Sequence, residues 1–273
     1  MDWKRFGFIA LIIIVLFSVV VAIGQAKQPP LLIVTSMLAT TIAVATPLIL
    51  GALSGVFCER AGVVNIGIEG MMLTAAFFGW LGAIYMFHIF GLGNGISIAL
   101  GVLFAILTGG LMALLHAALS ITFKVDQIIG GTVINILAVG LTGFLNRQLF
   151  FGKGSVFGGS VPGSPGVLPT IHIPITELFA PICGTSATCL ENVQAINRVF
   201  DQKPIAMGAI LLVFISHYIL FNTRWGLRTR AVGEHPKAAD TVGINVTKMR
   251  YANVVIGGMF AGLAGAYFTI ESV

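Results

Sequence analysis

The stretch CERAGVVNIGIEGMM (58–72) places charged and amide side chains between two long apolar segments. Asn65 and Glu69 are four residues apart, so on a helix they would share one face. An ionisable group inside a membrane is costly and normally faces a cavity or a partner. Glu69 is therefore expected either to line a substrate path or to be a carboxylate that pairs with a neighbouring helix or lies at the interface. Glu59 and Arg60 are more simply interpreted as a pair at the inner membrane surface.

A second polar group, Asn135, lies deep in the apolar segment KVDQIIGGTVINILAVG (124–140). A buried amide must find partners on another helix or on a ligand, and bonding between helices is the favoured interpretation. Gly67 and Gly70 would let another backbone approach and could interrupt the helix, as in transporters that bind substrate at broken helices. The predicted substrate path consists of Asn65, Glu69 and Asn135.

The polar segment 223–250 carries six basic and two acidic residues. Within it, KAADTVGI (237–244) has two alanines and a glycine that would let a partner approach closely. A helix over 236–244 would put Ala239 and Gly243 on one face. A solvated basic loop would explain the charges but not this pattern of small residues.

The chain has no motif for hydrolytic or covalent chemistry. It contains no HExxH, no GxSxG and no Walker A phosphate loop. Its five histidines are scattered without metal-ligand spacing. The sequence therefore predicts neither an enzyme nor a metal or cofactor site, and ATP-driven activity would need a separate ATPase.

The elements that carry these residues belong in a membrane. The chain is 57% hydrophobic and 9% charged, whereas a soluble domain has roughly 25% charged residues. A backbone in lipid must satisfy its own hydrogen bonds, so apolar segments of this length should be helices. We expect an all-α, polytopic transmembrane helix bundle, a single transmembrane domain over 1–273 with about seven spans. The apolar segments are 6–24, 31–57, 63–90, 95–123, 128–151, 204–222 and 251–270. The first of them could instead be a signal peptide, but a retained helix is favoured because no small-residue cleavage site follows it.

Basic residues at the segment ends set the orientation. With the N-terminus in the cytoplasm, the inner side receives ten basic residues and the outer side five. The inner set is Lys4, Arg5, Arg60, Lys124, Arg224, Arg228, Arg230, Lys237, Lys248 and Arg250, and the outer set is Lys27, Arg147, Lys153, Arg198 and Lys203. The net charge of +5 is thus explained by membrane topology and not by nucleic-acid binding.

Two long connections follow from this orientation: an outer loop at about 152–203 and a cytoplasmic loop at about 223–250. The outer loop contains ENVQAINRVF (191–200), which could form a short surface helix. It also contains Cys183 and Cys189, and the oxidising exterior favours a disulfide between them over two free thiols. Cys58 is expected to be a small buried side chain. Small residues four apart, such as Gly258 and Gly262, favour close helix packing within the chain over a dimer contact.

Three separated motifs, in the same order, carry a family resemblance. The loop 237–244 resembles the Glu-Ala-Ala-x-x-x-Gly coupling segment of ABC-importer permeases, with Lys237 where that family usually has Glu. ERAGVVNIGIEGMML (59–73) is similar to the signature of permeases for simple sugars and nucleosides, in the superfamily of the branched-chain amino acid permeases. VDQIIGGTVINILA (125–138) resembles a segment of the same family. Family members usually continue with further apolar segments, so a truncated C-terminus is expected.

The resemblance implies the transmembrane permease subunit of an ABC importer in the bacterial inner membrane. Nucleosides are favoured over simple sugars, because ribose-type relatives tend to carry Ile-Asp-Leu-Ser where this chain has 65–69. The implied partners are ABC ATPase subunits, a second permease subunit and an extracytoplasmic substrate-binding protein. The implied ATPase-coupling residues are Glu234, Pro236, Ala238, Ala239, Gly243 and Ile244. The alternatives are an ion-driven secondary transporter that uses Glu69, and a membrane scaffold that transports nothing.

Overall fold

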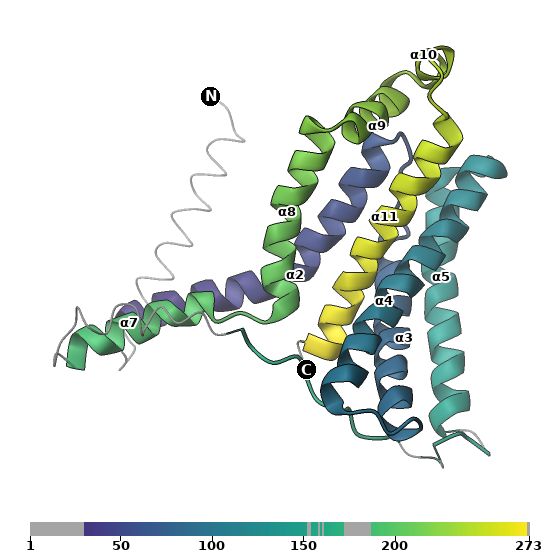
Figure 1. The fold of residues 1–273 in the computed structure, drawn as a ribbon. Coiled ribbons are helices and arrows are strands. Elements are labelled where there is room, and N and C mark those ends of the chain that lie inside the picture. Colours follow the sequence, from purple (N-terminus) through teal and green to yellow (C-terminus); the bar gives the residue numbers. More distant parts are fainter. Residues whose placement is uncertain (1–29, 152–153, 158, 160, 172–186, 272–273) are drawn as a thin grey trace, which may run out of the picture. The chain divides into compact units, whose positions relative to one another are not determined.

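The fold was described from a computed structural model that covers residues 30–151, 154–157, 159, 161–171 and 187–271 (Figure 1). These residues form helices and the connections between them, with one isolated bridge between Ile171 and Gln202. The all-α prediction is confirmed. The expected first span, 6–24, lies outside the described residues.

Within the described residues, six helices are long and apolar enough to cross a membrane. They are α2 (Pro30–Arg60), α3 (Ile68–His88), α4 (Asn94–Ala117), α5 (Gln127–Asn146), α8 (Pro204–Asn222) and α11 (Val246–Ala266). Single π-helical turns extend three of them: η1 (Ala118–Thr122) after α4, η2 (Arg147–Phe151) after α5 and η3 (Tyr267–Glu271) after α11. The shorter helices are α7 (Ala187–Phe200), α9 (Arg224–Glu234) and α10 (Pro236–Thr241). The prediction of a short helix in 191–200 is confirmed by α7.

Polar residues set several of the helix starts. The Asp126 side chain accepts hydrogen bonds from the amides of Ile128 and Ile129 at the start of α5. Asn245 does the same for the Lys248 amide at the start of α11, with an N···O distance of 2.9 Å. Such caps satisfy amides that have no partner within the helix.

The chain divides into two compact units. The first comprises 1–43 and 171–202, and the second comprises 44–170 and 203–273, so α2 contributes to both. Within the first unit, the side-chain amide of Gln202 donates to the carbonyl of Ala39.

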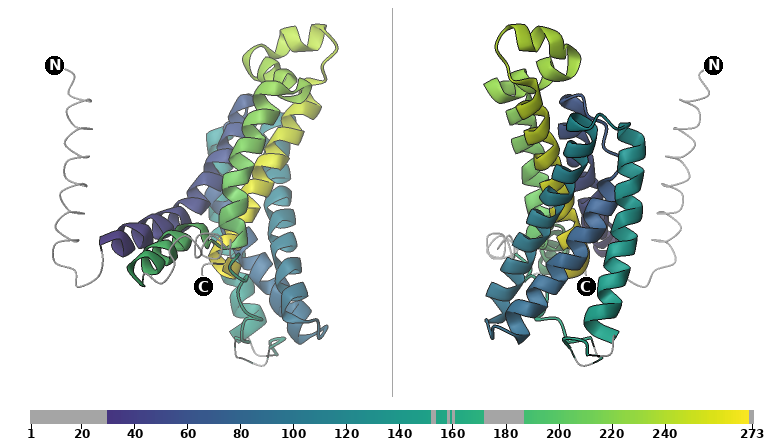
Figure 2. Two further views of the ribbon diagram at one scale, coloured as in Figure 1. Left: turned by 60° about the vertical axis from the view of Figure 1, so that its left-hand side comes forward. Right: turned by 90° about the vertical axis from the view of Figure 1, so that its right-hand side faces the viewer.

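In the second unit, α11 packs along α4 and α3, and α3 packs against α4 and α5 (Figure 2). Glycines bring the backbones together. A Cβ built on Gly109 of α4 would lie 2.6 Å from the Cα of Gly262, and one built on Gly265 would lie 2.8 Å from the amide nitrogen of Ala76 in α3. Small residues at a crossing allow this close approach. The expected use of Gly258 and Gly262 for packing within the chain is confirmed.

Segments predicted to share a membrane side meet at the same end of the second unit. Arg250 Nε donates to the carbonyl of Ala61 at 3.2 Å, and the amide of Val64 donates to Gln127 Oε1 at 2.7 Å. At the opposite end, the amide of Leu168 donates to the carbonyl of Ile270 at 3.2 Å. The helices α9 and α10 lie at the first of these ends (Figure 1).

Candidate translocation path and coupling segment

A non-helical connection separates α2 from α3 and runs from 61 to 67. Side chains of α4 and α5 bond to its backbone: Gln127 accepts from the Val64 amide, His116 Nε2 lies 3.2 Å from the Val64 carbonyl, and Asn135 Nδ2 donates to the Ile66 carbonyl. Irregular backbone at membrane depth persists only where neighbouring groups satisfy it. These three side chains therefore hold the connection in place.

Asn65 lies within this connection and is 7% exposed. Its side-chain oxygen accepts from the amide of Gly67 at 3.0 Å, and its amide nitrogen lies 3.5 Å from Met71 Sδ. The expectation that Asn65 and Glu69 share a helical face is wrong, because α3 begins only at Ile68. The Asn65 side chain turns the backbone just before that helix, as Asn does in local turns.

Asn135 uses both ends of its amide at the start of α3. Its oxygen accepts from the amide of Gly70 at 2.8 Å, while its nitrogen donates to Ile66 at 3.2 Å. A Cβ on Gly70 would lie 2.9 Å from the Cα of Asn135, so only glycine allows this approach. Asn135 therefore bonds to a neighbouring helix, as the favoured interpretation predicted.

Glu69 is an exposed residue in the first turn of α3. A carboxylate there is favoured by the helix dipole. Its place in a substrate path stays a prediction.

His116 and Gln127 were not singled out from the sequence. His116 is fully buried near the end of an apolar segment, and Gln127 is the first residue of the next helix. A polar side chain in the last turn of an apolar helix indicates that the side chain needs a hydrogen-bond partner. Here that partner is a backbone group far along the chain. The sequence does not reveal such a pairing.

The predicted coupling helix is shorter than expected. α10 ends at Thr241, and Gly243 follows in a left-handed conformation with φ +81°. The amide of Gly243 donates to Asp240 at 2.9 Å and that of Ile244 donates to Ala239 at 3.1 Å, which closes the helix end. The prediction of one helix over 236–244 with Ala239 and Gly243 on a shared face is therefore wrong.

Ala239 faces inward. It is 3% exposed and packs with Val232 of α9 and Met249 of α11. Ile244 packs against the same cluster, whereas Lys237, Ala238 and Val242 are exposed. Glu234 ends α9 and Pro236 begins α10. The exposed surface of this segment thus lies on Ala238 and Val242 rather than on Ala239.

The base of α9 is fixed to the membrane helices. Asn253 Nδ2 of α11 donates to the Thr229 hydroxyl at 3.1 Å, and both side chains are fully buried. A Cβ on Gly233 would lie 3.0 Å from the carbonyl carbon of Arg60 and 3.2 Å from the amide nitrogen of Gly62. The end of α9 therefore rests, backbone to backbone, on the corner that leads into the connection 61–67.

Two cysteines are described. Cys58 is free and buried, and Cys189 is disulfide-bonded. Cys183 lies outside the described residues, so the pairing of Cys183 with Cys189 stays a prediction.

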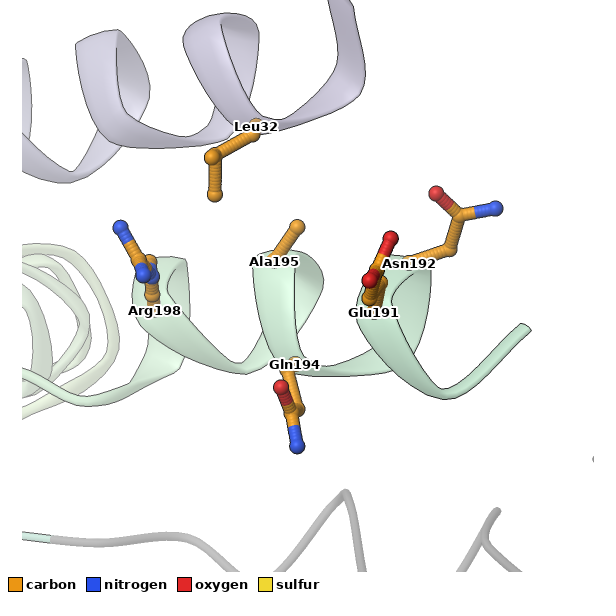
Figure 3. A pocket seen from close by; sticks show the side chains of 6 residues that line it. All are labelled: Leu32, Glu191, Asn192, Gln194, Ala195 and Arg198. Atoms are coloured by element: carbon orange, nitrogen blue, oxygen red, sulfur yellow. The ribbon is translucent and has the colours of Figure 1, made fainter. Parts of the chain in front are cut away.

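The first unit has a small hollow between α2 and α7 (Figure 3). Leu32 and Ala195 point toward each other across it, Glu191 and Arg198 also rise from α7 toward α2, and Gln194 points away. Opposite charges flank an apolar centre, and the structure supports no assignment beyond packing of α7.

Comparison with known proteins identifies the family. The family described as "Branched-chain amino acid transport system / permease component" matches residues 37–273. The chain belongs to this permease family. The recognition made from the sequence motifs is confirmed, and the family consists of transport proteins rather than enzymes.

Three relatives of the permease have named substrates. A guanosine ABC transporter permease protein, NupQ, of Bacillus subtilis is 41% identical over 241 residues, which is 86% of this chain and 67% of the relative. A nucleoside ABC transporter permease protein, NupC, of Lactococcus lactis is 34% identical over 234 residues, 85% of this chain and 66% of the relative. A putative glucose ABC transporter permease protein, TsgC13, of Haloferax volcanii is 36% identical over 238 residues, 86% of this chain and 62% of the relative. The chain thus spans about two thirds of the length of these relatives. No solved structure matches the permease significantly.

Family and helices together define a multi-pass membrane protein, since the matched region contains the apolar helices α3, α4, α5, α8 and α11.

Proposed function

We propose that the chain is the transmembrane permease component of an ABC importer that carries nucleosides across the bacterial inner membrane. Of the three relatives described above, two are named for guanosine and for nucleosides. The third is named for glucose, so simple sugars are the second candidate. The whole of 1–273 acts as one permease domain, with its N-terminus in the cytoplasm.

The observation that carries the proposal is the segment from α9 to α10. It extends beyond one end of the membrane helices, has exposed Lys237, Ala238 and Val242, and is anchored to α11 and to the 60–62 corner. An anchored surface of this kind suits a partner that pushes on the helices. The chain has no phosphate-binding loop of its own, so the partner is a separate ATPase.

In the proposed mechanism, ATP closes an ATPase dimer against α10. The buried Ala239 cluster passes the motion to α9, and α9 moves the corner at Arg60–Gly62. The helices then alternate access between the two sides of the membrane. A second permease subunit completes the pathway, and an extracytoplasmic binding protein delivers the nucleoside and sets much of the specificity.

The first test is co-purification of the complex from its native membrane. We expect an ATPase subunit to co-purify, and its turnover to rise when the binding protein and guanosine are added. If glucose but not guanosine raised the ATPase turnover, simple sugars would be the proposed substrates instead of nucleosides. Uptake that survives ATP depletion and collapses with the proton gradient would replace the ABC mechanism with ion coupling.

A second test addresses docking of the ATPase. Val242 is 73% exposed beside α10, and Val242→Asp would place an unpaired charge in a close-packed contact. Burying such a charge can cost several kcal/mol, and each 1.4 kcal/mol is about tenfold in affinity. ATPase recovery should fall at least about tenfold, while Thr247→Asp, at the exposed first turn of α11, should leave it unchanged. Equal recovery for both variants would contradict docking at α10. Ala239→Glu is unsuitable for this test because it would bury a charge within the chain.

A further inference from the structure

A pocket of about 360 Å³ lies between α3, α5 and η3 in the second unit. Its lining combines the rings of Phe77 and Trp80 with the side chains of Thr142, Asn146 and Thr269. The helices α3 and α5, which form its walls, pack side by side (Figure 2). The volume falls within the range of about 300–1,000 Å³ that small-ligand pockets occupy.

The pocket continues the faces that carry the two predicted path residues. On α3, Glu69, Phe77 and Trp80 are separated by eight and three residues, which puts them along one side of the helix. On α5, Asn135, Thr142 and Asn146 are separated by seven and four residues, again along one side. The pocket therefore lies on the same helix faces as Glu69 and Asn135, two to three turns nearer the opposite end of the bundle.

The polar groups in the pocket are not all used within the chain. The hydroxyl of Thr142 donates to Ala138 at 2.8 Å and that of Thr269 donates to Ala76 at 3.1 Å, so each oxygen can still accept. The Asn146 amide and the Trp80 indole N–H make no hydrogen bond with any described residue. Both residues are only partly buried, so their polar groups are accessible to hydrogen bonds with a ligand in the pocket.

The aromatic wall is held in place before any ligand arrives. The Trp80 ring lies 5.2 Å from that of Phe150, which is fully buried and stacks on Phe157 at 5.2 Å. On the α5 side, Gly143 is exposed, and a Cβ there would have no atom within 4 Å. The pocket thus has a fixed ring on one side and open space on the other.

The chemistry of the lining selects a neutral heteroaromatic ligand. Bases stack on aromatic side chains and are read through their edges by hydrogen bonds, and an Asn amide can donate and accept along one base edge. Among the residues that the structure describes, no charged side chain lines the pocket. A zwitterionic amino acid would have to leave both of its charges without partners there, whereas a nucleobase would not.

We propose that this pocket is a nucleoside subsite of the translocation path. The base lies against Trp80 and Phe77, and its edge is bound by the Asn146 amide. This inference rests on the proposed function, because a permease that carries no nucleoside has no use for such a site.

The experiment compares uptake by reconstituted complexes that contain the full chain, its ATPase and its binding protein. Gly143→Leu fills the open side of the pocket and should lower guanosine uptake at least about tenfold, as expected when a side chain takes the place of the ligand. Gly140→Leu is the matched control, because Gly140 is also an exposed α5 glycine with open space but does not line the pocket. Trp80→Leu should act like Gly143→Leu, and Trp80→Phe should restore much of the uptake.

Asn146→Asp tests whether residue 146 contacts the base, because a purely structural role would not change the choice between two nucleosides. The carboxylate can only accept, so it should shift the ratio of guanosine to adenosine uptake by about tenfold. If the parent complex takes up guanosine but the pocket variants behave like Gly140→Leu, the subsite is wrong and the proposed function stands. Failure of the parent complex to carry any nucleoside would overturn the proposed function and the subsite with it.

Discussion

Asn135 and Asn65 show how single amides organise the candidate path. Asn135 bridges two backbone groups of another segment, at 2.8 and 3.2 Å, and Asn65 turns its own segment just ahead of α3. Neither amide is left free to act as a permanent substrate ligand in this conformation. The Asn146 amide and the Trp80 indole N–H, further along the same helices, instead make no hydrogen bond with any residue that the structure describes. Deep polar residues can thus be structural while their neighbours on the same face remain available for a ligand.

Removal of the Asn135 amide should destabilise the protein. Asn135→Leu leaves the buried Gly70 amide without an acceptor, which costs about 1–3 kcal/mol. We expect a fall of several degrees in the Tm, measured by the reaction of a thiol dye with Cys58, which is free and buried until the bundle opens. Thr132→Leu on the same helix removes only a bond within α5 and should leave the Tm nearly unchanged. An unchanged Tm for Asn135→Leu together with lost transport would assign Asn135 to the substrate path instead.

At the scale of elements, the spans were predictable and the places where helices stop were not. Hydropathy located α4, α5, α8 and α11 because each apolar segment must satisfy its backbone alone. The break after Thr241 is a local turn at Gly243, which has a positive φ. The break at 61–67 depends on other segments, because side chains of α4 and α5 stabilise it. For the same reason, the small-residue pattern located a contact at Ala239 but not its direction, which is toward Val232 and Met249.

The contact between α9 and the 60–62 corner should carry the coupling. Gly233→Ala places a Cβ 3.0 Å from the Arg60 carbonyl carbon and 3.2 Å from the Gly62 amide nitrogen, so α9 must shift away from the corner. The exposed surface of α10 is unchanged, and the ATPase should therefore still co-purify. We expect the number of nucleosides moved per ATP hydrolysed to fall at least about tenfold, given the kilocalorie-scale coupling typical of linked sites.

Gly208→Ala in α8 is the control for this change, since a Cβ there meets nothing within 4 Å. A normal transport ratio for Gly233→Ala would show that the corner does not transmit the motion. Loss of ATPase recovery along with transport would show that α9 supports docking itself.

At the scale of the whole molecule, the second unit groups the helix ends as the basic residues predicted. Segments assigned to the same side of the membrane lie at the same end of the helices. The 61–64 backbone, Gln127 and Arg250 meet at one end, while Leu168 and Ile270 meet at the other. Hydropathy and charge report order and direction along the chain, so they specify this arrangement well. They carry no information on how 30–43 and 171–202 separate into a unit of their own, because that depends on contacts between distant segments.

The proposed orientation can be tested with two single cysteines at opposite ends. Lys237 is exposed on α10, and Asn94 is exposed at the first residue of α4. With the N-terminus in the cytoplasm, Asn94→Cys lies outside and Lys237→Cys inside. A membrane-impermeant thiol reagent should therefore label only Asn94→Cys in intact spheroplasts and only Lys237→Cys in inside-out vesicles. The native cysteines interfere little without reductant, because Cys58 is buried and Cys189 is disulfide-bonded. Adding a reductant should expose Cys189 from the outside. The reverse pattern for the two variants would invert the orientation and place α10 on the side where no ATPase could reach it.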